Sequence, residues 1–270
     1  MAEAVSPITE LKQRMRNMWM AGDFGEIARQ NEEWGYEFVS RLSLEPGMKV
    51  LDVGCGTGNQ SIPAAKTNAD VTGVDIATNL LEQAGERAKR ENLMIDFREG
   101  DAEELPFPDG EFDVVMSMFA AMFAPRPELV AAELLRVAKP GGLIAMANWT
   151  PESMPAEMFR ATAKYLPPPP NMQPAHMWGE EATVRQRLGA ADVKTERRAF
   201  IYTFLYDAAG AVDFFRQYYG PTAVAFGRLD EKNQQALRSD LIEIYEKLNQ
   251  GSRDAVTVRM EYLEVHARMA

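Results

Sequence analysis

The chain begins with two stretches of helical periodicity. Apolar residues recur every three or four positions over residues 7–20 and 24–42, which is the spacing of an amphipathic helix. Pro46 and Gly47 interrupt this pattern, since both residues favour turns. The sequence therefore predicts an N-terminal helical cap over residues 1–44.

Short apolar runs then alternate with helical patterns up to residue 150. Buried strands are predicted over residues 49–53, 70–74, 94–98, 112–118 and 143–149. Helices are predicted to begin near Asn59 and to cover residues 78–92 and 128–138. Strands that alternate with helices in this way form a parallel sheet with helices on both faces. The predicted fold class is therefore α/β, with a core over residues 45–150.

The pattern changes after residue 150. Helices are predicted over residues 150–166, 178–188, 208–219 and 230–248, with four consecutive prolines at 167–170. Alternating apolar positions predict two further strands over residues 193–206 and 255–267. We therefore expect one domain over residues 1–270, with a helical insertion or lid at 151–192 and C-terminal strands and helices at 193–270.

Composition narrows the classes of function. The formal net charge is −11, which disfavours binding to a nucleic-acid backbone. With a single cysteine and two histidines, neither an intramolecular disulfide nor a metal site is expected. No stretch approaches the roughly 20 apolar residues of a membrane span, and the N-terminal residues are polar. These features favour a cytoplasmic protein without a membrane span.

Three glycines follow the first predicted strand in the segment 49-KVLDVGCGTGNQS-61. A phosphate-binding loop would require a lysine near Asn59 and Gln60, and none is there. A dinucleotide-binding loop would require a third glycine at position 59. The remaining pattern is G-x-G-x-G at Gly54, Gly56 and Gly58, which alone does not identify a ligand; a sulfonium nucleoside is the third candidate.

The segment VLDVGCGTG resembles motif I of the class I S-adenosylmethionine-dependent methyltransferases. The resemblance continues through VTGVDIA, REGDAEELPFPDGEFDVVMS and ELLRVAKPGGLIAMANW, and it covers about residues 45–150. The chain most resembles the small-molecule branch that includes the ubiquinone and menaquinone C-methyltransferases. This resemblance implies a Rossmann-like, mostly parallel seven-stranded sheet with an antiparallel last strand. It also implies S-adenosyl-L-methionine as methyl donor and S-adenosyl-L-homocysteine as product.

Acidic residues end the second and third predicted strands, at the edge where open α/β sheets bind ligands. Asp75 can there accept hydrogen bonds from both ribose hydroxyls, with Ile76 beside it. The resemblance implies that Asp101 and the Ala102 backbone bind the adenine. It further implies donor contacts by five more positions: the backbone of Gly54, Gly56 and Gly58, the carbonyl of Phe119 and, indirectly, Asp52.

The sequence says less about the residues that bind the acceptor than about those that bind the donor. His176 is the candidate general base, because it belongs to the insertion that leaves the donor edge of the sheet, although a packing role stays open. His266 and Cys55 are interpreted as structural residues. An apolar acceptor pocket is predicted from aromatic and methionine side chains, namely Trp19, Phe24, Met122, Trp178 and Tyr218.

These observations predict methyl transfer to a small, apolar or aromatic metabolite, by a monomer or homodimer. The acceptor atom stays open. Two other hypotheses also stay open at this point: a non-catalytic protein that binds S-adenosylmethionine for regulation or scaffolding, and an enzyme that transfers a different group from the same donor.

Overall fold

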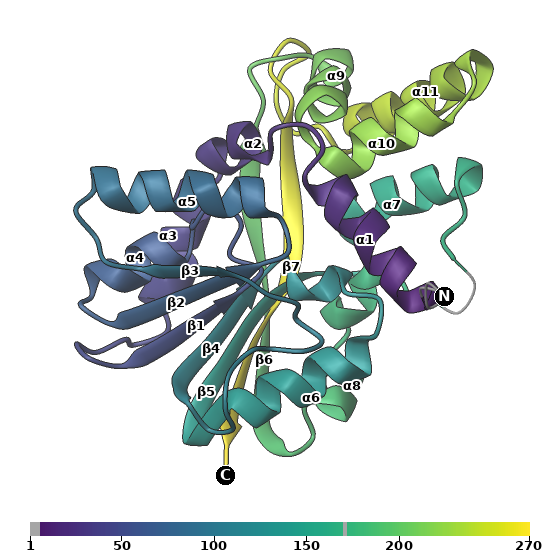
Figure 1. Cartoon of the computed structure of the whole chain (residues 1–270). Coiled ribbons are helices and arrows are strands. Elements are labelled where there is room, and N and C mark those ends of the chain that lie inside the picture. Colours follow the sequence, from purple (N-terminus) through teal and green to yellow (C-terminus); the bar gives the residue numbers. More distant parts are fainter. Residues whose placement is uncertain (1–5, 170–171) are drawn as a thin grey trace.

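The computed structural model describes residues 6–169 and 172–270. Its strands form a seven-stranded sheet in the order β3-β2-β1-β4-β5-β7-β6 (Figure 1). The last strand, β7, runs antiparallel to both of its neighbours, β5 and β6, as the resemblance implied. The strands are β1 (Lys49–Val53), β2 (Asp70–Asp75), β3 (Asp96–Glu99), β4 (Phe112–Met118), β5 (Ala138–Trp149), β6 (Ala191–Thr203) and β7 (Thr257–Met269). The predicted fold class is confirmed.

Helices cover both faces of the sheet and gather at one end of it. Figure 1 shows α3, α4 and α5 on one face and α6 and α8 on the other, while α9, α10 and α11 lie beyond the carboxyl ends of the parallel strands. The helices are α1 (Pro7–Trp19), α2 (Phe24–Gln30), α3 (Glu32–Ser40), α4 (Ser61–Lys66), α5 (Thr78–Arg90), α6 (Pro127–Val137), α7 (Met154–Tyr165), α8 (Glu181–Arg187), α9 (Ala208–Tyr218), α10 (Gly220–Arg228) and α11 (Glu231–Leu248). Two 3₁₀ turns, η1 (Ala121–Phe123) and η2 (Ala175–Gly179), follow β4 and precede α8. Among the helices described, none combines the length and the apolarity that a membrane crossing requires.

Periodicity explains the core elements. The central strands β1 and β4 are buried along almost their whole length, because helices cover both of their faces. In α5 the buried side chains are Leu80, Ala84 and Ala88, which recur at the spacing of one helix face. These elements match their predictions to within a few residues. They place the carboxyl ends of β1, β2 and β4 side by side.

Two predicted helices differ from the structure, and one observed helix was not predicted. The helix predicted over residues 24–42 is broken at Asn31 into α2 and α3. In α3, Gly35 packs closely on the loop after β1, since a Cβ at this position would lie 2.1 Å from the Asn59 carbonyl oxygen. The helix predicted from residue 178 begins as η2, because Gly179 packs against the Trp149 backbone. The helix α10 was not predicted. Pro170, the last of the four consecutive prolines, lies outside the described residues.

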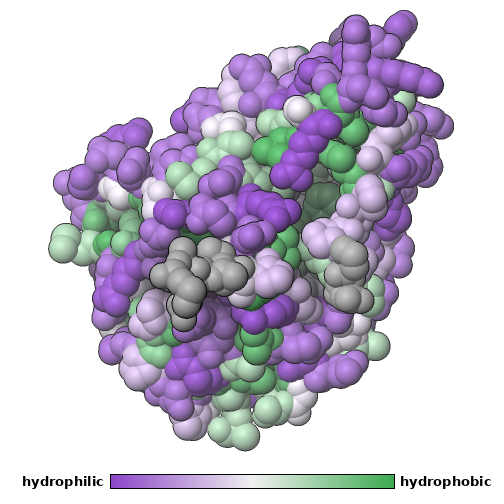
Figure 2. Space-filling model, turned by 45° about the vertical axis from the view of Figure 1, so that its right-hand side comes forward, coloured by the Kyte–Doolittle hydropathy of each residue, from purple (hydrophilic) through white to green (hydrophobic). Residues whose placement is uncertain are grey.

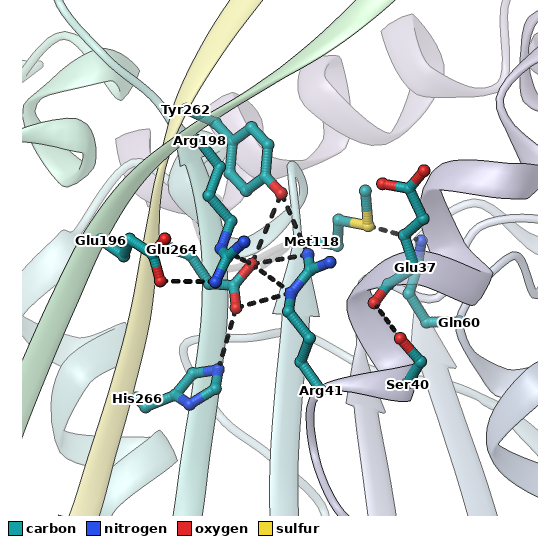
Figure 3. Close-up of polar contacts among 10 residues, drawn as sticks. All are labelled: Glu37, Ser40, Arg41, Gln60, Met118, Glu196, Arg198, Tyr262, Glu264 and His266. Atoms are coloured by element: carbon teal, nitrogen blue, oxygen red, sulfur yellow. Dashed lines mark hydrogen bonds and ion pairs between the residues drawn. The ribbon is translucent and has the colours of Figure 1, made fainter.

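A buried carboxylate links the N-terminal helices to the end of the chain. Glu264, on β7, is 3% exposed. It accepts hydrogen bonds from Arg41, which follows α3, at 2.7–3.0 Å, and forms an ion pair with Arg198 at 3.3 Å (Figure 3). The Nε2 of His266 lies 3.2 Å from the Oε1 of Glu264. Tyr262 accepts a further bond from Arg41 at 3.1 Å. His266 therefore contributes to a structural cluster, as predicted.

The cluster keeps Glu264 ionised. Burial by itself would raise the pKa of Glu264, but the hydrogen bonds from His266 and Arg41 and the charges of Arg41 and Arg198 outweigh burial and lower the pKa to about 2. A carboxyl whose pKa is lower in the folded state stabilises the fold above its unfolded pKa, near 4.5. That contribution is lost as the pH falls toward 2.

We expect Glu264→Gln to lower the free energy of unfolding at pH 7 by about 2–4 kcal/mol, because it leaves Arg41 and Arg198 without their buried partner. Urea unfolding measures this change. Glu196→Gln removes an exposed partner of Arg198 and should change the same quantity by less than about 1 kcal/mol. The deficit of Glu264→Gln should shrink as the pH falls below about 4.5. Equal effects of the two substitutions would contradict this role.

Candidate active site

The glycine loop connects β1 to α4 at the carboxyl end of the parallel strands. Gly54 has a φ of +73°, and a Cβ at this position would lie 2.3 Å from the Cβ of Ala120, so a larger residue does not fit. Gly56 has a φ of +51°, and no heavy atom of the described residues lies within 4 Å of its Cβ position. Since Gly56 also lines a cavity, the backbone of the loop is accessible to a ligand that binds in that cavity.

Asp75 lies beside this loop, at the end of β2. Its Oδ2 accepts a hydrogen bond from the Gly56 amide at 2.9 Å, and its Oδ1 accepts one from the Ala77 amide at 2.8 Å. Burial raises the pKa of Asp75, and the backbone N–H groups of Ala77 and Gly56 oppose that shift. Asp75 and Ile76 both line the cavity. The pairing of β1 with β2 thus brings a carboxylate next to the exposed peptide, as predicted.

Asp101 follows β3 and lines the same cavity together with Ala102. Its Oδ1 accepts a hydrogen bond from the Glu103 amide at 2.9 Å. Its Oδ2 lies 2.5 Å from the Nζ of Lys12, which also contacts Glu103 at 2.7 Å. The predicted adenine-binding carboxylate is therefore in ion-pair contact with α1.

A second cation of α1 reaches the neighbouring strand. The Nε of Arg16 donates a hydrogen bond to the Ile76 carbonyl at 3.1 Å, and its Nη2 pairs with Glu99 at 3.1 Å. Together with Lys12, Arg16 holds α1 across the carboxyl ends of β2 and β3. Sequence reasoning missed both residues, because nothing in their helical pattern distinguishes them from solvated surface charges.

Asp52 and Gly58 lie behind the loop rather than in the cavity wall. Asp52 is fully buried, and its Oδ2 accepts a hydrogen bond from the Ser61 hydroxyl at 2.6 Å. Burial raises the pKa of Asp52 to about 7, and the charge of Asp75 adds to this effect while the Ser61 hydrogen bond opposes it. Gly58, whose φ is +84°, packs on Ala84 of α5. Neither residue therefore reaches the cavity wall, and contact of Gly58 or Asp52 with the donor stays a prediction.

Phe119, directly after β4, has a backbone conformation that is rare for a bulky residue, with a φ of +53°. Its amide donates a hydrogen bond to the Ala147 carbonyl at 2.9 Å, and its ring stacks on Trp149 with the centroids 3.6 Å apart. Such strain persists where the surroundings hold it, and it is frequent at ligand sites. Phe119 lines the cavity, as expected of a residue that contacts the donor.

The cavity has a volume of about 840 Å³ and extends from the glycine loop to α7 and α10. Ligand pockets range from about 300 to 1,000 Å³, so this one can hold two small molecules side by side. We call the part around Gly56, Asp75 and Asp101 the donor half. The acceptor half is walled by contacting aromatic rings, namely Trp19, Phe24, Phe123, Phe159, Phe215 and Tyr219. Figure 2 shows a hollow with hydrophobic residues in its depth on the face that carries α1 and α7.

Two of the five residues that were predicted for the acceptor pocket lie in the cavity wall. Trp19 and Phe24 line the cavity. In the described structure Met122, Trp178 and Tyr218 do not line it. Met122 is 2% exposed within the core, Trp178 packs under the Arg187 guanidinium, and Tyr218 turns toward Phe214 while its neighbour Tyr219 faces the cavity. Their sequence pattern indicates burial, but it does not say on which side of a turn a ring lies.

His176 lies in η2 and lines the cavity. Its Nδ1 is buried and has no hydrogen-bond partner among the described residues. Burial lowers the pKa of His176, and the positive charge of Arg160 lowers it further, against the opposing charges of Glu180 and Glu152. A neutral imidazole with an unpaired nitrogen in a cavity wall is able to accept a proton.

Cys55 sits within the glycine loop and is 2% exposed. Burial raises the pKa of its thiol, as do the charges of Asp52 and Asp75, so the reactive thiolate is disfavoured. This environment agrees with the small packing residue that was expected.

Comparison with known proteins gives the same picture. A family described as a methyltransferase domain matches residues 51–146. An uncharacterized protein of Mycobacterium tuberculosis is 37% identical over 236 residues, which cover 85% of this chain and 86% of that protein. A demethylmenaquinone methyltransferase of Renibacterium salmoninarum is 38% identical over 121 residues, or 45% of this chain and 49% of that enzyme.

The fold also has solved counterparts. The crystal structure of the YcgJ protein of Bacillus subtilis superposes with a TM-score of 0.60, at 15% identity, over 88% of this chain and 98% of that one. At this identity the likeness shows the fold alone. The sequence relatives, the matching domain and the glycine loop with its two following carboxylates agree, and the chain belongs to the class I S-adenosylmethionine-dependent methyltransferases of the small-molecule type.

Proposed function

We propose that this enzyme methylates a small, apolar or aromatic metabolite that binds in the acceptor half of the cavity. The observation that carries the proposal is the wall of aromatic rings next to the donor half, in which Trp19 contacts Phe123 at 5.2 Å and Tyr219 at 5.8 Å between centroids. Rings of this kind favour an apolar partner, because burying apolar surface is stabilising and aromatic pairs add to that gain.

The donor half fits S-adenosylmethionine. Gly56 offers bare peptide with open space above it, and Asp75 stands beside it with two oxygens for the ribose hydroxyls. Asp101 and Ala102 line the next part of the wall, where we place the adenine. When bound, the donor supplies a methyl group on a positively charged sulfur.

Side chains of the enzyme position the acceptor and remove its proton. The aromatic wall excludes water and holds the acceptor in line with the donor half, and such positioning is worth up to about 7–11 kcal/mol of the barrier. His176 accepts the proton of an acceptor hydroxyl, amine or thiol at its unpaired Nδ1. We propose residues 1–44 as a cap and residues 151–192 as a lid, because α1, α7 and η2 supply cavity walls.

We further propose that the enzyme acts in the cytoplasm, as a monomer or homodimer, without nucleic acid as partner. Its net charge of −11 supports the last point, because a strongly acidic surface repels phosphate backbones.

Asp75→Asn should weaken binding of S-adenosylhomocysteine by about 10–100-fold, because it removes the charge from the ribose-binding group. Isothermal titration calorimetry measures the affinity. Asp96→Asn removes an exposed carboxylate that pairs with Arg98 at the start of β3, outside the cavity, and serves as the matched control. Affinity that is equal in the Asp75 variant and the wild type would refute the assignment of the ribose site.

Lys12→Ala should loosen α1 over the donor half, because it removes the contacts with Asp101 and Glu103. We expect S-adenosylhomocysteine to dissociate about 3–10-fold faster, and the amides of α1 to exchange hydrogen faster. Stopped-flow fluorescence and hydrogen exchange measure the two effects. Arg14→Ala removes a charge from the exposed side of the same helix and should change neither quantity. If both variants behave like the wild type, the α1 contacts do not retain the donor.

His176→Asn should lower the methylation rate, measured as release of S-adenosylhomocysteine with a panel of phenols and amines. The pKa of His176 is lowered, so the imidazole is already neutral at pH 7 and becomes protonated only at more acidic pH. The rate of the wild type should therefore rise with pH through an apparent pKa below about 6.5 and then stay level. The variant should lack this rise. A wild-type rate that is independent of pH below neutrality would rule out His176 as the base.

A further inference from the structure

The charges in the cavity are divided unevenly between its two halves. The carboxylates in its wall, Asp75, Glu99 and Asp101, lie at the ends of β2 and β3. The cations of α1 pair with two of them, since Lys12 contacts Asp101 and Arg16 contacts Glu99. In the described structure the acceptor half has no carboxylate in its wall, and its one permanent charge is Arg160 of α7.

Arg160 is held in place but not neutralised. Its Nη1 donates a hydrogen bond to the Pro151 carbonyl at 2.8 Å, which leaves Nε and Nη2 without a partner among the described residues. No carboxylate of those residues lies within ion-pair distance of it, and the nearby Glu152 pairs with Arg197 at 3.1 Å instead. Arg160 is exposed, and it also lines the cavity, so its guanidinium is available to an anionic ligand that binds there.

His176 adds a second polar group at the same place. It lines the same cavity as Arg160, and its buried Nδ1 has no partner in the described structure. Phe159 precedes Arg160 in α7, and its ring contacts Phe123 at 5.7 Å. The acceptor half thus combines an aromatic wall, one free cation and one neutral hydrogen-bonding group.

We propose that the acceptor carries a carboxylate on its apolar or aromatic body, and that Arg160 binds this carboxylate. The proposal rests on the function proposed above and names the substrate class of that site. The two free nitrogens of Arg160 suit a carboxylate, because guanidinium groups bind carboxylates through paired, charge-assisted hydrogen bonds. The body of the acid packs against Phe123, Phe159 and Tyr219. A cationic acceptor is disfavoured, because no carboxylate of the described residues lines this half of the cavity.

Binding of matched probes tests the proposal without turnover. The enzyme is first titrated with S-adenosylhomocysteine and then, when saturated, with 2-naphthoate, 2-naphthamide or 2-naphthylmethylammonium, followed by calorimetry. The three probes share an aromatic body and differ in charge. We expect naphthoate to bind at least about tenfold more tightly than the amide, and the ammonium to bind most weakly. A panel of benzoate, indole-3-acetate and octanoate covers acids of other shapes.

Arg160→Gln should abolish the preference for the acid over the amide, and Arg160→Lys should retain part of it. Arg228→Gln is the matched control, because it removes one positive charge from an exposed position of α10 outside the cavity, and it should keep the preference. Equal binding of acid and amide to the wild type, a preference that survives in Arg160→Gln, or no binding by any acid of the panel would overturn the inference. Failure in the first titration, with S-adenosylhomocysteine, would instead contradict the proposed function itself.

Discussion

The Asp75 carboxylate accepts hydrogen bonds from the amides of Gly56 and Ala77, and these bonds tie the loop after β1 to the turn after β2. The donor half depends on this contact. It fixes the glycine peptide at the carboxyl edge of the sheet and keeps a charged group beside it in a partly desolvated wall. Because β1 and β2 are adjacent and parallel, two segments that are 19 residues apart in the chain meet at one point.

The acceptor half depends instead on contacts between aromatic rings. Its rings come from α1, α2, η1, α7, α9 and the junction of α9 with α10. These elements belong to separate parts of the chain, from the N-terminal helices to α10. The charges of α1 help to hold this assembly, because Lys12 and Arg16 bind the ends of β3 and β2 while Trp19 of the same helix contacts Phe123 and Tyr219. One helix therefore joins the donor half to the acceptor half.

The sequence predicts the residues of the donor half better than those of the acceptor half. The strands of the core, Asp75, Asp101 and the bare peptide at Gly56 could be predicted, because periodicity and short motifs encode local structure. Lys12, Arg16 and Arg160 could not, since a charged residue on an amphipathic helix looks the same whether it faces water or a cavity. Tyr218 and Tyr219 show the same limit for aromatic residues, because adjacent rings point to opposite sides and the pattern does not distinguish them.

The most direct test of this account is a crystal structure of the enzyme with S-adenosylhomocysteine bound. The account predicts ribose hydroxyls within hydrogen-bond distance of Asp75, the adenine next to Asp101 and Ala102, and the sulfur facing the rings of Trp19 and Phe123. A nucleoside bound elsewhere, or an Asp75 side chain turned to bulk water, would contradict it.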